Sequence, residues 1–266
     1  EDIYAGERLV LRADSRIRST QIGLAASIGL DHLPTRPHPR VVILSAGPDL
    51  VEPGQSLKAD EEFETNSWLL TTAVREVGAI GYRVHSIPDD EEELLAVIED
   101  QLVRADLIVI SGERNDDSFD LITRTLQKMG EITTLDLAIE NSGRHNFGQI
   151  GPDKTPVVTL PSDPINAYIS FELFVRPMIR TMLGVATIHR PSVKAKLEKA
   201  ISSTPGTRSY VRAILSEDAT SVRALEIQDE ISTLSDANSF IALSEKDETI
   251  EAGASVNVVV LERRYI

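Results

Sequence analysis

The middle of the chain alternates short apolar runs with longer segments in which apolar residues recur every three or four positions. The apolar runs lie at residues 41–45, 83–87, 107–111, 134–139 and 157–160. Short apolar runs bounded by turn residues are typical of strands in a sheet that is covered on both faces. We therefore predict an α/β domain with a mostly parallel sheet over residues 39–184.

Amphipathic helices are predicted between these strands. The first starts near Asn66 and is ended by Gly78, since glycine commonly terminates helices. A later helix takes Ser118 as its N-cap. The last helix spans about residues 163–183, and Pro177 is predicted to kink it because proline cannot donate the next hydrogen bond.

Two segments without helical periodicity flank this domain. Residues 1–38 contain the strand-like "RLVL" and end in "LPTRPHPR", which predicts the end of a β-rich domain and a stiff connector. Residues 185–266 contain the alternating stretches "SYVRAILS", "VRALEI", "SFIALS" and "SVNVVVLE", which predict a small β-barrel, or a sandwich. The chain starts without Met or an apolar leader, so we expect a fragment of a longer protein.

Composition narrows the possible functions. The chain has 42 acidic and 27 basic residues, a net charge of −15, and no basic patch, so nucleic acid is not an expected partner. No apolar run reaches the roughly 18 residues of a membrane-spanning helix, so direct membrane insertion is not expected. The absence of cysteine excludes thiolate chemistry and fits a cytoplasmic protein. Five scattered histidines and the acidic run at 59–64, interpreted as solvated charge, predict no metal site.

The stretch "LIVISGERNDDSFD", residues 107–120, raises a specific chemical question. A buried strand ends in Ser111 and Gly112, as strands do before loops that hold a phosphate with backbone N–H groups. The loop then continues with "ERNDD" instead of further glycines. Carboxylates repel phosphate, so this stretch predicts an anion site that is inherited and no longer used.

Several stretches resemble the molybdopterin molybdotransferases, the family of MoeA and the gephyrin E-domain. "VVILSAGPDLVEPGQSL" resembles the family's "STGDELVEPG", "FETNSWLL" its "DSN" helix start, and "SGERNDDSFDLI" its "SGGVSVGDYD". "LAIENSGRHNFG" stands where the family has "MKPGKPLAFG", and "TLPSDPINAYISFELFVRP" where it has "GLPGNPVSALVTFELFVRP". The resemblance implies a MogA-like sheet sandwiched by helices, a homodimer, and insertion of molybdate into adenylated molybdopterin with Mg²⁺.

The resemblance also implies candidate site residues. Asp120 stands at the family's catalytic aspartate and Asp49 at its acidic pair, so these two are candidates for a Mg²⁺ or acid–base pair, or are inherited without a task. Positions that bind the cofactor in the family are occupied here by Ser111, Gly112, Ser162 and Asp163.

Departures from the family pattern favour a degenerate member. Two loop lysines are replaced by Glu140 and Gly143. Turning a Lys–phosphate attraction into a Glu–phosphate repulsion changes the interaction by roughly twice 4 kcal/mol at about 4 Å and an effective dielectric of about 20. Our leading hypothesis is a catalytically degenerate dimeric scaffold that needs no cofactor, and the alternative is an active molybdotransferase. Binding of another nucleotide or acidic metabolite has no motif behind it.

A scaffold of this kind would bind the peptide tail of a protein partner, as the resemblance to gephyrin implies. In the matching stretches Tyr210 and Phe240 are the candidate aromatic contacts, followed by Ser244 and Glu245. The expected partner is a membrane receptor or a division protein like FtsZ, which would recruit the chain to the membrane or division site. The alternative is that both aromatic side chains only pack the small barrel.

Overall fold

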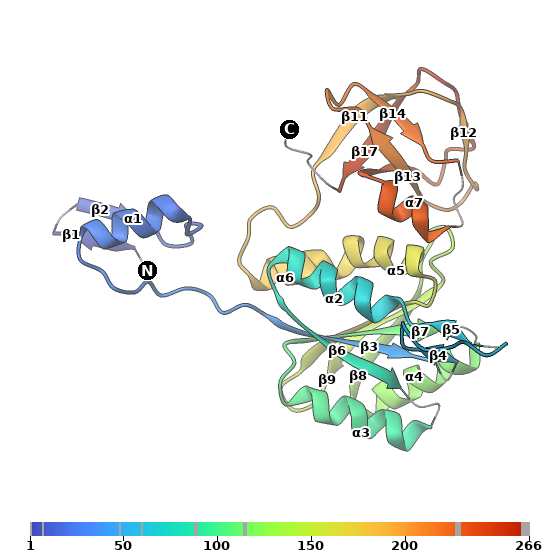
Figure 1. The fold of residues 1–266 in the computed structure, drawn as a ribbon, viewed down its shortest axis with the longest axis horizontal. Helices are drawn as coiled ribbons and strands as arrows, with labels where there is room; N and C mark the ends of the chain where they lie inside the picture. The colour runs from blue at the N-terminus through green and yellow to red at the C-terminus, as the bar shows by residue number, and fades with distance from the viewer. Residues whose placement is uncertain are drawn as a thin grey trace.

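The computed structural model describes residues 2–261 except 7, 48, 60, 88–89, 114–115 and 227–229. In chain order, these residues form a small N-terminal unit, a layered α/β domain and a closed β-barrel (Figure 1). The N-terminal unit contains the hairpin of β1 (Ile3–Ala5) and β2 (Arg8–Leu11), followed by α1 (Ser19–Ser27), which was not predicted. A long extended connector separates this unit from the rest of the molecule (Figure 1).

The α/β domain is built on a sheet whose described strands follow the order β6-β3-β7-β10-β9-β8. The mostly parallel sheet is confirmed by β6 (Ile80–Ile87), β3 (Arg40–Ala46), β7 (Leu107–Glu113) and β10 (Thr155–Pro161), which pair in parallel. Two antiparallel strands extend it, β9 (Arg144–Ile150) and β8 (Gly130–Asp136). The strand predicted at 134–139 therefore starts earlier, and β9 was missed.

Helices cover both faces of this sheet (Figure 1). Along β3, side chains alternate: Val41 and Ile43 pack with α2 (Asn66–Val77) and with the helical segment at residues 164–182. Val42 and Leu44 point the other way, toward α3 (Glu91–Leu102) and α4 (Asp116–Met129). All four side chains are fully buried, because a parallel strand between two helical layers has no solvent face.

The helix ends follow the sequence in part. Gly78 ends α2 as predicted, with a φ of 102° that glycine adopts without steric cost. The prediction that Ser118 caps α4 is wrong, because the helix already begins at Asp116.

The helical segment at the C-terminal end of the α/β domain is interrupted. α5 (Pro164–Ser170) continues into a π-helical turn, η1 (Phe171–Val175), and then into α6 (Arg176–Met182). Pro177 has no N–H and its ring crowds the carbonyl four residues earlier, so the disturbance falls on its N-terminal side.

The C-terminal part is a closed barrel in the described residues, as predicted. Its strands are β11 (Ser192–Leu197), β14 (Ser221–Ala224), β13 (Ser209–Leu215), β15 (Ser239–Leu243) and β17 (Ser255–Val260). β11 was missed, although Ala195 and Leu197 point inward while the neighbouring lysines point outward. The short helix α7 (Ile231–Asp236) and the pair β12 (Ile201–Ser202) and β16 (Thr249–Ile250) accompany the barrel.

The barrel rests on α5 through an apolar cluster around Phe240. The loop before β9 adds backbone contacts, because Arg208 N donates to the Ala138 carbonyl at 2.8 Å and Glu140 N donates to the Arg208 carbonyl at 3.0 Å. These contacts hold the two domains together and shape the space between them. No helix in the described part of the chain is long and apolar enough to cross a membrane.

Candidate functional site

The carboxyl ends of β3, β7 and β10 meet at one edge of the sheet, beside the start of α2. Asn66 connects them: its Nδ2 donates to Ser111 Oγ at 2.8 Å and to the Ser162 carbonyl at 2.7 Å. Ser111 Oγ donates in turn to the Pro161 carbonyl at 2.8 Å. Open α/β sheets bind ligands at this edge. The fold thus brings the predicted positions Ser111 and Ser162 together through an asparagine that the sequence analysis did not single out as a site residue.

Two buried polar atoms at this edge have no hydrogen-bond partner among the described residues. They are Asn66 Oδ1, on a residue that is 6% exposed, and Ser45 Oγ, on a residue that is 1% exposed at the end of β3. Almost all buried polar groups in native proteins are paired, and an unpaired one costs about 1–3 kcal/mol. An amide oxygen that accepts and a hydroxyl group that can donate or accept are therefore left without a partner at this edge of the sheet.

The phosphate-type loop is described only in part. Gly112 follows Ser111 with a φ of 137°, a backbone region that favours glycine. Residues 114–115 lie outside the described residues, as do the side chains of Glu113 and Asp116. Asp117 is exposed in the first turn of α4.

The predicted pair Asp49 and Asp120 comes from two different elements. Asp49 lies in the turn between β3 and β4 (Leu50–Val51), where its main-chain carbonyl accepts from Glu62 N at 3.0 Å. Asp120 is exposed on α4, and its carboxylate lies 3.6 Å from the guanidinium of Arg144. The described residues contain no group of three or more His, Asp or Glu that could hold a metal ion.

Arg144 is a functional candidate that the sequence analysis missed. It follows Gly143, where the family has a lysine, so the basic residue one position later was the available signal. Its guanidinium also stacks over the Phe119 ring at 4.0 Å. A positive charge is therefore retained beside Asp120 although the loop lysines are lost.

A pocket of about 450 Å³ lies between the start of α5, the loop before β9 and the barrel. Arg212 on β13 brings a positive charge to the barrel wall and is only 4% exposed. Glu140 and Asp163 bring two carboxylates from the α/β domain, and Tyr210 lines the same wall as Arg212. The predicted positions Asp163 and Tyr210, assigned to different functions, thus share one pocket.

Both pocket carboxylates are hydrogen bonded to the protein. Asp163 caps α5, since its Oδ1 accepts from the backbone N and the Nδ2 of Asn166, each at 2.8 Å. Glu140 Oε1 accepts from Thr204 Oγ1 of the barrel at 2.8 Å. Glu140, which stands where the family has a lysine, therefore forms a contact between the two domains.

His145 supports the pocket loop from behind and is fully buried. Its Nδ1 lies 2.8 Å from the Thr159 carbonyl and must donate, since a carbonyl only accepts. Nε2 then accepts from Ser142 Oγ at 2.7 Å. Burial lowers the pKa of His145, so the ring is neutral near pH 7.

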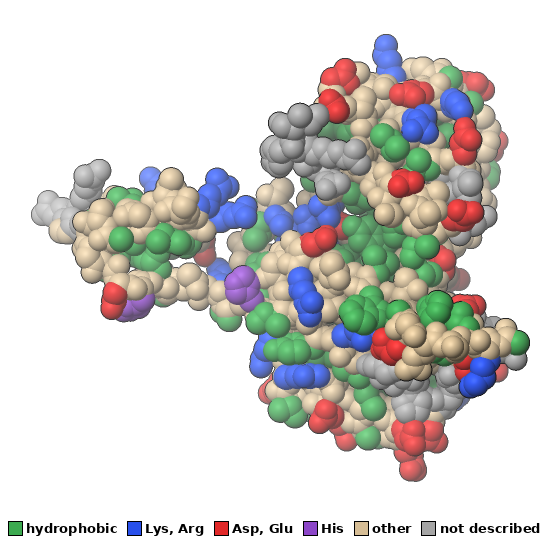
Figure 2. Space-filling model, in the orientation of Figure 1, with side chains coloured by type: hydrophobic (Ala, Val, Ile, Leu, Met, Phe, Trp, Pro, Cys, Tyr) green, Lys and Arg blue, Asp and Glu red, His purple; other side chains and the backbone are tan. Residues whose placement is uncertain are grey.

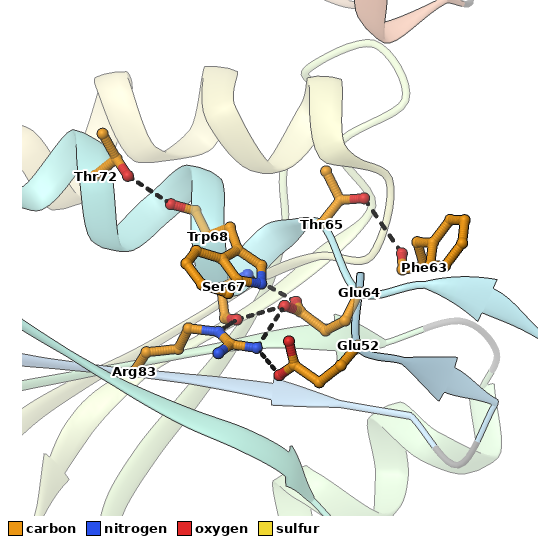
Figure 3. Close-up of polar contacts among 8 residues, drawn as sticks. All are labelled: Glu52, Phe63, Glu64, Thr65, Ser67, Trp68, Thr72 and Arg83. Atoms are coloured by element: carbon orange, nitrogen blue, oxygen red, sulfur yellow. Dashed lines mark hydrogen bonds and ion pairs between the residues drawn. The ribbon is translucent and has the colours of Figure 1, made fainter. Parts of the chain in front are cut away.

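A buried ionic network supports the start of α2 (Figure 3). Glu64, from the run interpreted as solvated charge, is 1% exposed and accepts from Ser67 N at 2.7 Å and Ser67 Oγ at 2.5 Å. Arg83 on β6 lies 3.6 Å from Glu64, pairs with Glu52 and stacks over Trp68 at 4.2 Å. The interpretation of Glu64 as solvated is therefore wrong. The network holds the first turn of α2, and with it the amide that joins the strand ends.

The two aromatic residues proposed as partner contacts lie at the domain junction. Phe240 is 2% exposed and meets the Tyr168 ring edge-on at 6.4 Å, while Tyr210 is half-buried in the pocket wall. Side chains alternate along β15, so Phe240 points to the outer face while Ile241 points into the barrel. Phe240 therefore packs against α5 and not in the barrel interior.

The other two proposed partner contacts lie in the turn after β15. Ser244 donates its backbone N and Oγ to Asp247 Oδ2 at 2.7 and 2.9 Å. Glu245 lies 3.4 Å from Arg208 Nη2 in an exposed ion pair. Tyr210 and, more weakly, Glu245 raise the pKa of Arg208. These residues stabilise the turn beside the pocket.

A layered α/β domain followed by a small closed barrel, with a pocket between the two, is the architecture of the MoeA-like fold. Residues 43–181 match the family model described as a probable molybdopterin binding domain, and residues 194–261 match the MoeA C-terminal region, domain IV. The chain belongs to the MoeA family.

Relatives support this assignment. Molybdopterin molybdenumtransferases 1 and 2 of Mycobacterium tuberculosis are each 30% identical to this chain, over 98% and 97% of its length. Two structures of the MoeA protein from Pyrococcus horikoshii match with TM-scores of 0.82 and 0.76, at 25% and 21% identity. The matched regions cover 96% and 95% of this chain, and 62% of the Pyrococcus horikoshii chain in both structures. The chain spans 63% and 65% of the two mycobacterial relatives.

Proposed function

We propose that this chain is the ligand-binding and C-terminal part of a MoeA-type molybdotransferase, which acts on adenylated molybdopterin in molybdenum cofactor biosynthesis. The observation that carries the proposal is the pair of unpaired polar atoms at the sheet edge, Asn66 Oδ1 and Ser45 Oγ. Asn66 is hydrogen bonded to the carbonyl of Ser162, and the next residue, Asp163, lines the pocket that contains Arg212. The 30% identity to two molybdopterin molybdenumtransferases supports the same function.

The chemistry of these groups suits such a ligand. A pterin ring carries N–H donors, and Asn66 Oδ1 is a preoriented acceptor because the amide nitrogen is held by two hydrogen bonds. Preorganised groups lose little entropy on binding. A buried guanidinium such as that of Arg212 can bind phosphate oxygens through charge-assisted hydrogen bonds.

The altered loops lower the expected affinity without removing the site. Glu140 and Asp163 replace a lysine and an asparagine of the family pattern, and both carboxylates already accept hydrogen bonds from protein groups. Mg²⁺ carried with the ligand phosphates would bridge them to such carboxylates. We therefore expect slow turnover and weakened binding, and not a complete loss of function.

The scaffold hypothesis ranks second. Phe240 is covered by α5 and Tyr210 belongs to the pocket wall, so the proposed aromatic contacts do not form a free groove in the described part of the chain. A tail of a receptor or of an FtsZ-like protein has no other described feature in its favour.

The test is titration calorimetry of the full chain with adenylated molybdopterin, together with expression of the complete protein in a strain that lacks its molybdotransferase. We expect micromolar binding and partial rescue of a molybdoenzyme. Arg212→Met should weaken binding about tenfold or more, as loss of a charge-assisted contact does. Lys199→Met is the matched control, because it breaks an exposed ion pair with Glu226 on the surface of the barrel domain. Absence of both binding and rescue would return the scaffold hypothesis to first place.

We further propose that two copies assemble as a homodimer. Exposed apolar side chains gather over β4–β5 and the start of α2 (Figure 2), where Phe63 and Trp68 are 45% and 51% exposed. Light scattering should give twice the chain mass. Trp68→Glu should shift the mass toward the monomer, and Trp68→Phe should not.

A further inference from the structure

Glu172 is a buried carboxylate at the junction of the two domains. It lies in η1, directly after the helix whose residues line the pocket, and is 6% exposed. Arg190 donates to it twice, from Nε at 2.8 Å and from Nη2 at 2.7 Å. Burial, with a contribution from this carboxylate, raises the pKa of Tyr168 beside it. A bidentate pair of this kind holds both partners in one orientation.

The same guanidinium also reaches the C-terminal end of the last barrel strand, on the side of the barrel that packs against α5. Arg190 Nη1 donates to the Leu261 carbonyl at 2.5 Å, and Leu261 directly follows β17. Arg190 itself lies in the connector between α6 and β11, and the next residue, Pro191, accepts from Val260 N at 2.9 Å. One side chain in the connector thus ties the α5–η1 segment to the last barrel strand. We call this contact the Arg190 bridge.

The Arg190 bridge bears on the pocket because both of its ends continue into pocket walls. Glu172 follows α5, whose N-cap Asp163 and first-turn residue Asn166 line the pocket. The last barrel strand pairs with β15, which pairs with β13, the strand that carries Arg212. A change in the angle between the domains would therefore change the separation of Asp163 from Arg212.

We infer that Arg190 is a positioning residue: through Glu172 and the Leu261 carbonyl it holds the barrel at the angle to α5 that sets the width of the ligand pocket. This inference rests on the proposed function for the role of the pocket, but the geometry of the bridge is independent of any ligand.

A variant without the bridge should still fold. Arg176 Nε lies 3.4 Å from Glu172 Oε2, so a cation remains beside the buried carboxylate after Arg190→Met. The apolar cluster around Phe240 and the contacts of Arg208 with the loop before β9 also remain. Arg190→Lys keeps the charge but cannot reach Glu172 and Leu261 with one planar group. The two variants therefore separate charge from geometry.

The first measurement is the distance between the domains. The chain has no cysteine, so cysteines introduced at the exposed positions Glu99 and Glu217 are the only sites for nitroxide labels. Electron-spin distance measurements should give one narrow distribution for the unaltered chain and for Lys199→Met. Arg190→Met should broaden the distribution at least twofold, with Arg190→Lys in between. A folded Arg190→Met protein with an unchanged distribution overturns the inference.

The second measurement is the affinity for adenylated molybdopterin in the same proteins. Arg190→Met should weaken it about fivefold or more, in the range by which residues outside a site modulate binding. A broadened distance with unchanged affinity overturns the link to the pocket. If the unaltered chain does not bind the probe, the proposed function fails, while the distance measurement still decides the role of Arg190.

Discussion

Glu140 is a residue at which this chain differs from the MoeA pattern and which also has a defined role in the structure. It occupies the position of a family lysine, lines the pocket, and accepts a hydrogen bond from Thr204 of the barrel. Its charge opposes an anionic ligand, whereas its hydrogen bond contributes to the domain contact. The two effects are separable by substitution.

Glu140→Lys should raise the affinity of the pocket for a small anion such as pyrophosphate by about tenfold, because a repulsive charge becomes an attractive one. Calorimetric titration at low salt is the measurement, and the gain should shrink as salt screens it. Glu251→Lys makes the same charge change in an exposed turn of the barrel. Equal gains in the two variants would mean that net charge, and not the pocket, is responsible.

His145 makes a pH-dependent contribution to stability. Its pKa is lowered in the folded chain by burial, so below pH 6.5 the unfolded state binds more protons than the folded state. The contribution is complete above about pH 7 and is lost as the pH falls through 6.5, by up to about 1.4 kcal/mol per pH unit.

Urea unfolding between pH 5 and 7.5 measures this loss. His145→Asn keeps a donor for the Thr159 carbonyl but cannot titrate, so its stability should fall less on acidification. His189→Asn, at an exposed position, should follow the unaltered chain. An unchanged slope in His145→Asn would assign the acid sensitivity to other groups.

Among the helices and strands, α3 follows local rules most closely. Asp90 caps it, and its Oδ1 accepts from Glu92 N at 2.9 Å and from Glu93 N at 3.0 Å. Three glutamates occupy the first turn, where the helix dipole favours negative charge. Buried Leu94 and Ile98 supply the packing face.

Asp90→Ala should destabilise the chain by about 1 kcal/mol, because two backbone N–H groups lose their acceptor. The urea midpoint at pH 7 is the measurement. Glu99→Ala, on the exposed face of the same helix, should shift it by less than about 0.5 kcal/mol. A loss in Glu99→Ala as large as that in Asp90→Ala would contradict the capping argument.

Two connectors join the N-terminal unit, the α/β domain and the barrel. Residues 30–39 lack regular secondary structure and are mostly exposed, and residues 184–191 link α6 to the barrel. Backbone without ladder hydrogen bonds can enter a protease site after little local unfolding.

Brief digestion with subtilisin should therefore cut first within residues 30–39 and next within 184–191, as mass spectrometry of the fragments would reveal. Trypsin is unsuitable, because Arg36 and Arg190 each precede a proline. An early cut within residues 107–160 would mean that the α/β domain opens before its connectors do.

The sequence alone predicted the parts of this protein that depend on local patterns. Apolar runs of strand length located β3, β7 and β10, because a strand buried on both faces must be apolar throughout. Gly78 was recognised as the end of α2 because the effect of a glycine on a helix end acts within one helical turn. β9 was missed because "RHNFGQI" mixes charged, polar and glycine residues, and its pairing between β8 and β10 comes from the sheet.

Only the tertiary structure decided which side chains share a site. Asn66, Ser111 and Ser162 belong to three separate elements, and their contacts exist because parallel strands end at one edge of the sheet. Arg212 and Glu140 face one pocket because the barrel packs on α5. No local sequence pattern predicts this packing. Contacts between residues distant in sequence depend on how layers and domains pack. For this reason the sequence identified the family and its altered loops, whereas the unpaired polar atoms of Asn66 and Ser45, the buried Glu64 and the Arg190 bridge required the fold.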